Sequence, residues 1–72
     1  MAIPVYNRPA GYRYLGNTNT TEVHDLHSEK GKCQIDEIIT ARHAVVFSPD
    51  TDDQAHRERY DNCHWCIGGS TR

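Results

Sequence analysis

The sequence contains few of the large apolar residues from which a hydrophobic core is normally built. Leucine, isoleucine, valine and phenylalanine together supply 12 of its 72 residues. That share, about 17%, falls below the roughly 20% typical of chains that fold around such a core. The chain also lacks the high net charge of disordered sequences, since its formal net charge is −2. We therefore expect one small domain that is stabilised by a metal, by disulfides or by association.

Cysteine is scarce, and its odd count argues against a disulfide framework. The three cysteines would leave one thiol unpaired in any intramolecular scheme. The first residues have neither a basic start nor a long apolar stretch, so they predict no signal peptide. No apolar run approaches the length of a membrane span. We expect a cytoplasmic protein without membrane association, in which clustered cysteine and histidine favour a metal over a disulfide.

Basic residues are not in excess, and this disfavours a nucleic-acid partner. Eight lysines and arginines stand against ten aspartates and glutamates, and they are scattered along the chain. A nucleic-acid-binding module is usually basic, with these residues gathered on one face. A local basic patch stays open as an alternative, and it would have to combine residues from Arg8, Arg13, Arg42, Arg57, Arg59 and Arg72.

The N-terminal half predicts an extended arm followed by a β-hairpin. Residues 1–11 contain two prolines and a glycine and are expected to form an extended or disordered arm. Apolar and polar residues alternate over 12–17, and a second short strand is expected over 21–24. The asparagines and threonines between these stretches are typical of a turn. The domain itself is expected to span 12–67, with 68–72 as a frayed tail.

The C-terminal half predicts two short helices around a third strand. Three isoleucines recur at helical spacing in a helix that is expected to begin at Cys33. Residues 44–47 form a short run rich in β-branched residues and predict the third strand. Ser48 as the N-cap and Pro49 at the first helical position predict the start of a second, polar helix. These elements indicate a small α+β domain with a sheet of about three strands and two short helices.

Cys63 and Cys66 form the motif with the clearest chemical meaning. Two cysteines separated by two residues place both sulfurs on one side of a tight turn, which is half of a tetrahedral zinc site. Cys33 supplies a third ligand, and a histidine is expected to supply the fourth. His24 lies at the end of a predicted strand and is favoured over His27, because a strand end is held more rigidly than a loop. The predicted site holds one structural Zn²⁺ through His24, Cys33, Cys63 and Cys66.

The other titratable residues predict no further chemistry. His64 is expected to point away from the metal, and His43 and His56 are interpreted as ordinary surface residues. A thioredoxin-type redox pair would need a substantial helix after Cys66, but only six residues follow it. The sequence has no Ser-His-Asp arrangement, paired-carboxylate motif, phosphate loop or cofactor fingerprint. No enzymatic activity is therefore predicted.

The order of these motifs resembles the Ada-like zinc-binding domains, the family of the metal-binding domain of the Ada methylation-repair protein. The resemblance covers roughly residues 12–67. Val23-His24 is similar to the start of the first half-site of the family, and Cys33 matches its cysteine after an insertion. Residues 60–66 match the second half-site, which begins at a tyrosine and contains the Cys-x-x-Cys pair. The resemblance implies a small α+β fold with one zinc, and it supports His24 over His27.

The chain departs from the Ada domain at the residue that matters most for activity. His24 stands where the Ada domain has the cysteine that accepts a methyl group from DNA. A zinc-bound imidazole has no free lone pair to alkylate, so methyl transfer is not expected. We predict a structural zinc module that contacts another protein. The alternatives are a nucleic-acid-binding module, by analogy with the family, and a zinc-thiolate sensor of oxidation or alkylation.

Overall fold

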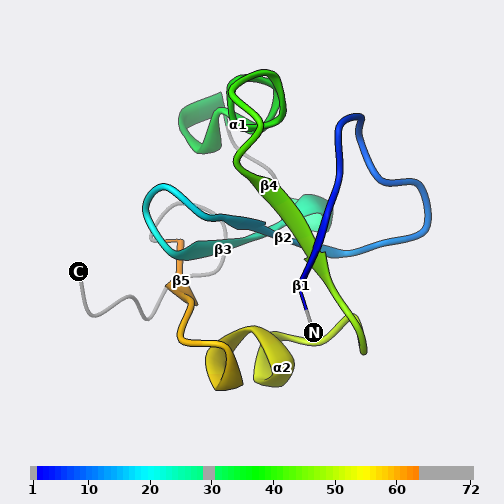
Figure 1. Ribbon diagram of the computed structural model, residues 1–72, viewed down its shortest axis with the longest axis vertical. Helices are drawn as coiled ribbons and strands as arrows, with labels where there is room; N and C mark the ends of the chain where they lie inside the picture. The colour runs from blue at the N-terminus through cyan, green and yellow to red at the C-terminus, as the bar shows by residue number, and fades with distance from the viewer. Residues whose placement is uncertain (1, 29–30, 64–72) are drawn as a thin grey trace.

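The chain folds into one mixed five-stranded sheet with a short helix on each side (Figure 1). The computed structural model describes residues 2–28 and 31–63. The predicted tail, 68–72, lies outside the described residues. The strands are β1 (Ala2–Pro4), β2 (Tyr14–Asn17), β3 (Glu22–Asp25), β4 (Ala44–Phe47) and β5 (Asp61–Asn62); the helices are α1 (Ile35–Thr40) and α2 (Asp52–Arg57), with 3₁₀ turns η1 (Leu26–Ser28) and η2 (Gly31–Cys33).

The sheet has more strands than the sequence predicted. The strand order is β1-β4-β2-β3-β5, in which β3 and β5 run parallel and the other neighbours run antiparallel. The prediction of about three strands is therefore wrong, while the molecule is an α+β domain with two short helices. The two additional strands, β1 and β5, have three and two residues. Such short strands show no readable alternation, and Pro4 is compatible with β1 because β1 lies at a sheet edge.

The sheet separates two small apolar clusters. On the α1 side, Ala44 of β4 packs in a cluster with Leu15 of β2 and Ile38 of α1. On the α2 side, Phe47 of β4 packs in a second cluster with Ala55 of α2. Because successive residues of a strand face opposite sides, β4 is buried at all four positions. Figure 1 shows α1 and α2 on opposite sides of the sheet, so that each face is covered by one short helix.

Both helices begin later than the sequence predicted. The first begins at Ile35, and Gln34 precedes it in a left-handed conformation without a side-chain cap. The second begins at Asp52, and Thr51, not Ser48, is its N-cap. The Thr51 hydroxyl accepts a hydrogen bond from the Gln54 N–H at 3.1 Å. The residues before Thr51 form the connection from β4 to α2 instead of the first helical turn.

The N-terminal segment contributes a strand to the sheet. In the predicted arm, 1–11, β1 pairs with β4 so that Ala2 lies opposite Phe47. The Val5 N–H extends this pairing by donating to the Ala44 carbonyl at 3.0 Å. Among the described residues, no helix is long and apolar enough to cross a membrane.

Candidate metal centre

Three of the four predicted ligands come together in the structure. His24 lies in β3, Cys33 ends η2, and Cys63 follows β5 directly. Their donor atoms all lie within 4.8 Å of one another. The Sγ atoms of Cys33 and Cys63 are 3.7 Å apart. These residues are far apart in the sequence, so the tertiary structure assembles a compact group of one imidazole and two sulfurs.

The hairpin of β2 and β3 directs His24 towards the α1 side of the sheet. In the antiparallel register, His24 lies directly opposite Leu15. Leu15 belongs to the cluster that also contains Cys33 and Cys63. The preceding residue, Val23, packs in the cluster on the α2 side. Because strand residues alternate in direction, the hydrophobic Val23 fixes which face His24 occupies.

The short strand β5 places Cys63 next to His24. The Asp61 N–H donates to the Thr21 carbonyl, and the Cys63 N–H donates to the Val23 carbonyl, each at 2.9 Å. These two bonds form the parallel ladder between β5 and β3. The strand that sequence reasoning missed is thus the one that brings Cys63 to the histidine. Its sequence signal is weak because only two residues pair.

A tight turn places Cys33 over the same face of the sheet. The Gln34 N–H donates to the Gly31 carbonyl at 3.2 Å, and Gln34 then adopts a left-handed conformation with φ of 54°. Ile35 and Ile38, which follow in α1, are buried and anchor the helix in the cluster that contains Cys33. Cys33 therefore precedes the helix and does not open it.

The distance between the sulfurs fits a shared metal ion. Two thiolates bound at about 2.3 Å to one tetrahedral ion lie about 3.8 Å from each other. The separation of Cys33 Sγ and Cys63 Sγ, 3.7 Å, is close to that value. It is much longer than a disulfide bond, which measures about 2.05 Å. Sulfur and imidazole donors also suit transition metals better than Mg²⁺ or Ca²⁺, which prefer oxygen. The group could hold a metal ion.

The donor residues are buried and line a pocket. His24 and Cys33 are each 4% exposed, and Cys63 is 2% exposed. The Nε2 atom of His24 is itself buried. A pocket of about 300 Å³ reaches all three residues, and its other described lining residues are Asn17, Asn19, Thr20, Glu22, Gln34, Glu37, Ile38, Ala41 and His43. Most of these other lining residues are polar or charged, whereas the cluster that contains Cys33 and Cys63 is apolar.

The remaining sequence-predicted residues lie elsewhere or outside the described part of the chain. Cys66 and His64 lie outside the described residues. His27 is exposed in η1 and is not part of the donor group. His43 lines the pocket wall, and His56 hydrogen-bonds Asn62 at 2.7 Å. Of the two histidines considered as the fourth ligand, the one in β3 is therefore the one that the fold brings to the cysteines.

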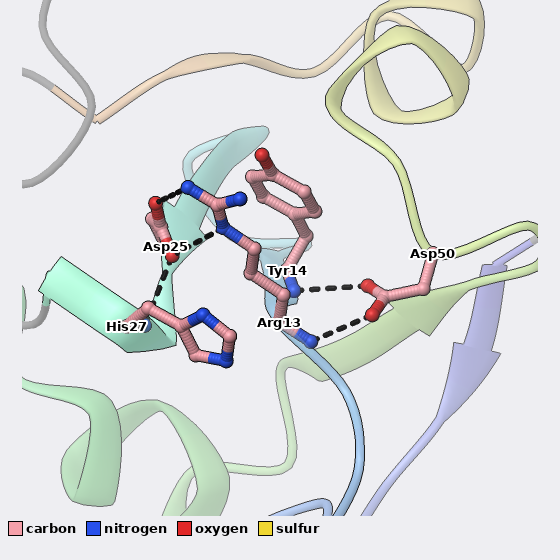
Figure 2. Close-up of polar contacts among 5 residues, drawn as sticks. All are labelled: Arg13, Tyr14, Asp25, His27 and Asp50. Atoms are coloured by element: carbon pink, nitrogen blue, oxygen red, sulfur yellow. Dashed lines mark hydrogen bonds and ion pairs between the residues drawn. The ribbon is translucent and has the colours of Figure 1, made fainter.

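A polar network that sequence reasoning missed holds the end of β3 (Figure 2). The Arg13 guanidinium donates two hydrogen bonds to the Asp25 carboxylate, from Nε at 3.1 Å and from Nη2 at 2.9 Å. The His27 backbone N–H donates a third bond to this carboxylate at 2.9 Å. Asp25 is 6% exposed, so these bonds satisfy a charge that is removed from water. The network immediately follows His24 and supports its backbone.

The electrostatics of this network keep Asp25 ionised. The hydrogen bonds from Arg13 lower the pKa of the Asp25 carboxyl, and they outweigh its burial, which acts in the opposite direction. In turn, the carboxylate raises the pKa of Arg13. The pairing of Arg13 with Asp25 could be predicted only if the hairpin register were known. That register places Tyr14 opposite Asp25 and so brings Arg13 close to the carboxylate. Turn length sets that register, and the residue types alone do not reveal it.

Asp50 connects the same region to the α2 side of the sheet. Its carboxylate accepts the backbone N–H groups of Arg13 at 2.7 Å and Tyr14 at 3.0 Å (Figure 2). These bonds tie the start of β2 to the segment between β4 and α2. They also account for the late start of α2, because Asp50 bonds to another strand and does not enter the first helical turn.

Comparison with known protein families, curated proteins and solved structures finds no match to this chain. The resemblance to Ada-like domains is therefore a prediction from the sequence alone.

Proposed function

We propose that the chain is a small structural zinc-binding module that contacts another protein. The observation that carries the proposal is the buried group of His24, Cys33 and Cys63, whose donor atoms lie within 4.8 Å of one another. Zn²⁺ is the proposed ion because zinc takes sulfur and imidazole ligands in a tetrahedron. Cys66 completes the set, since it follows Cys63 at the spacing typical of paired zinc ligands. When bound, the ion cross-links segments that few apolar side chains hold together.

A relationship of this chain to Ada-like domains is part of the proposal as a hypothesis. Its support is the order of the predicted ligands along the chain, from His24 through Cys33 to the Cys-x-x-Cys pair. Methyl transfer is not part of the proposal, because the first ligand is an imidazole. A complete set of four protein ligands also leaves no position on the metal for a substrate, and this favours a structural over a catalytic role.

A structural role predicts that the metal and the fold are lost together. The structural zinc of zinc fingers supplies on the order of 10 kcal/mol of folding free energy. A chain of this size seldom stores more than about 5 kcal/mol in its core. Native mass spectrometry should therefore find one zinc per chain, and a chelator should abolish the cooperative thermal transition. A folded chain without zinc and with an unchanged melting temperature would contradict the proposal.

Matched variants distinguish the proposed zinc ligands from neighbouring residues that do not bind the metal. His24→Ala and Cys63→Ser should each lose the zinc, because each removes a donor from the buried group. His27→Ala is the control, since His27 lies three residues further in the exposed part of η1. It should keep one zinc. Cys66→Ser tests the fourth ligand and should weaken zinc binding as well.

A surface beside α1 supports the interaction with a protein. Tyr6 is 63% exposed, and the Arg42 guanidinium lies 5.9 Å from the centre of its ring. Tyr6 and Arg42 line a second pocket of about 300 Å³ together with Ile39 and Thr40. An aromatic ring and an isoleucine beside an arginine suit a partner segment that carries an apolar side chain next to a carboxylate.

The interaction surface is tested with two exposed substitutions. Tyr6→Ala should lose a partner that the zinc-loaded wild-type protein retains in affinity capture. Arg57→Ala is the control, because Arg57 is exposed on α2, on the opposite side of the sheet. Equal retention by both variants would exclude this surface as the contact.

The geometry gives a nucleic-acid role less support. Two of the arginines that a basic patch would need are engaged with carboxylates. Arg8 Nε lies 2.8 Å from Asp36, and Arg13 contacts Asp25. A salt titration with duplex and single-stranded DNA at low ionic strength tests this alternative directly.

A further inference from the structure

The two described cysteines lie close enough to each other to react. Their Sγ atoms are 3.7 Å apart, although Cys33 and Cys63 are separated by 30 positions in the chain. A disulfide would require a shortening of about 1.7 Å, to a bond of about 2.05 Å. Cys33 lies at the end of a 3₁₀ turn and Cys63 just beyond a two-residue strand. Neither cysteine lies in the middle of a long element.

A pocket beside the donor group offers an approach to the two cysteines for a small oxidant. The pocket of about 300 Å³ beside the donor group includes Cys33 and Cys63 in its lining. A peroxide molecule needs the space of about two waters, on the order of 60 Å³. The wall offers the side-chain amides of Asn17 and Gln34 and the hydroxyl of Thr20 as hydrogen-bonding groups. Two carboxylates in the same wall, Glu22 and Glu37, disfavour negatively charged oxidants, so a neutral peroxide fits best.

We propose that Cys33 and Cys63 form a peroxide-responsive pair that is oxidised to a disulfide with release of the metal. One thiolate attacks a peroxide oxygen; the O–O bond breaks, and the leaving hydroxide takes up a proton to become water. The sulfur becomes a sulfenic acid. The second thiolate attacks this sulfur; the S–S bond forms as the S–O bond breaks, and the leaving hydroxide takes up a second proton from solvent to become water. The two sulfurs lose two electrons in total, and the peroxide gains them.

Release of the metal follows from the change in ligand chemistry, and this part rests on the proposed function. A disulfide sulfur is neutral and no longer offers a thiolate, which is the form that binds the metal. Oxidation therefore removes two donors at once and leaves His24 with at most one further cysteine. The oxidised chain therefore exchanges a metal that joins β3, η2 and β5 for a disulfide that joins only η2 and the residue after β5, and His24 in β3 is no longer linked to them.

Peptide mapping of the zinc-loaded wild-type protein identifies the pair. The protein is treated with hydrogen peroxide, free thiols are blocked with iodoacetamide, and the chain is cut with trypsin. Cleavage after Lys32 and Arg42 releases 33–42, and cleavage after Arg59 releases 60–72. A second cut by chymotrypsin after Trp65 separates Cys63 from Cys66.

The expected product is peptide 33–42 linked to 60–65, with a mass lower by two hydrogens and one zinc released per linked chain. A disulfide within 60–72 would overturn the proposal, as would a link to the peptide that contains Cys66. Sulfinic acid without any cross-link would also overturn it. Absence of zinc in the starting protein would refute the proposed function instead, and the position of the cross-link would still decide this proposal.

Two substitutions test whether peroxide reaches the cysteines through this pocket. Ala41→Phe places a ring in the wall of the pocket that leads to the sulfurs. Arg57→Phe adds the same ring at an exposed position of α2, on the opposite side of the sheet, and serves as the control. Oxidation by peroxide should slow several-fold in the first variant and keep its wild-type rate in the second. Equal rates in all three proteins would contradict entry through this pocket.

Discussion

Replacement of Gly16 by alanine should destabilise the fold without removing the metal. Gly16 is buried in the middle of β2, and an added Cβ would lie 2.7 Å from Phe47 Cζ and 2.9 Å from Tyr60 Cε2. It would also lie 3.0 Å from Val45 Cγ2. Phe47 is fully buried, and its ring packs edge-on against Tyr60 with centroids 5.1 Å apart. The rings cannot move away without opening the cluster on the α2 side.

The size of the effect follows from two opposing contributions. Extra volume in a packed core typically costs about 1–3 kcal/mol. Alanine also restricts the unfolded chain more than glycine does. Where the native backbone tolerates alanine, this restriction stabilises the folded state by about 0.4–1 kcal/mol. The net loss in unfolding free energy should be about 1–2 kcal/mol. Gly31→Ala is the matched control, since its Cβ would meet no atom of the described residues within 4 Å. That variant should be as stable as the wild type or slightly more stable.

Urea unfolding of the zinc-saturated proteins measures this difference. The slope against urea should be unchanged in both variants, so that the shift in midpoint reports stability. Zinc stoichiometry should also be unchanged, because Gly16 packs against the α2-side cluster while His24 faces the α1 side. The packing argument would be refuted if Gly16→Ala and Gly31→Ala had equal unfolding free energies. Loss of zinc from Gly16→Ala alone would refute the separation of the two faces.

Two further substitutions test the second helix and the ring cluster. Thr51→Ala removes the hydroxyl that accepts the Gln54 N–H and should cost about 1 kcal/mol in a denaturation experiment; an unchanged midpoint would show that the cap contributes nothing. Burial raises the pKa of Tyr60, so the folded state retains this proton more strongly than the unfolded chain does. Stability is therefore fully present below about pH 10, the pKa of an unfolded tyrosine, and falls as pH rises from there towards the folded pKa. Tyr60→Phe should reduce this alkaline loss in melts recorded across that range, and an identical slope in both proteins would contradict the assignment.

Several features of the fold could be predicted because they depend on neighbouring residues. Alternation identified the hairpin that carries His24, and the β-branched run identified β4. The scarcity of large apolar residues indicated a cross-linked domain, and cysteine spacing indicated which residues to examine. His24, Cys33 and Cys63 do lie together, although in sequence they are separated by turns and a helix.

The other features of the fold depend on contacts between residues that are far apart in the sequence. Ala2–Pro4 and Asp61–Asn62 are strands only because β4 and β3 present edges to them. Thr51 caps α2 in place of Ser48, because Asp50 is held by the start of β2. The pairing of Arg13 with Asp25 depends on the hairpin register. The composition of the chain by itself predicted a cross-linked domain, since its apolar side chains are too few for a large core. Only the tertiary structure decided which donor residues come together, because the separation of the Cys33 and Cys63 sulfurs depends on how the whole sheet is assembled.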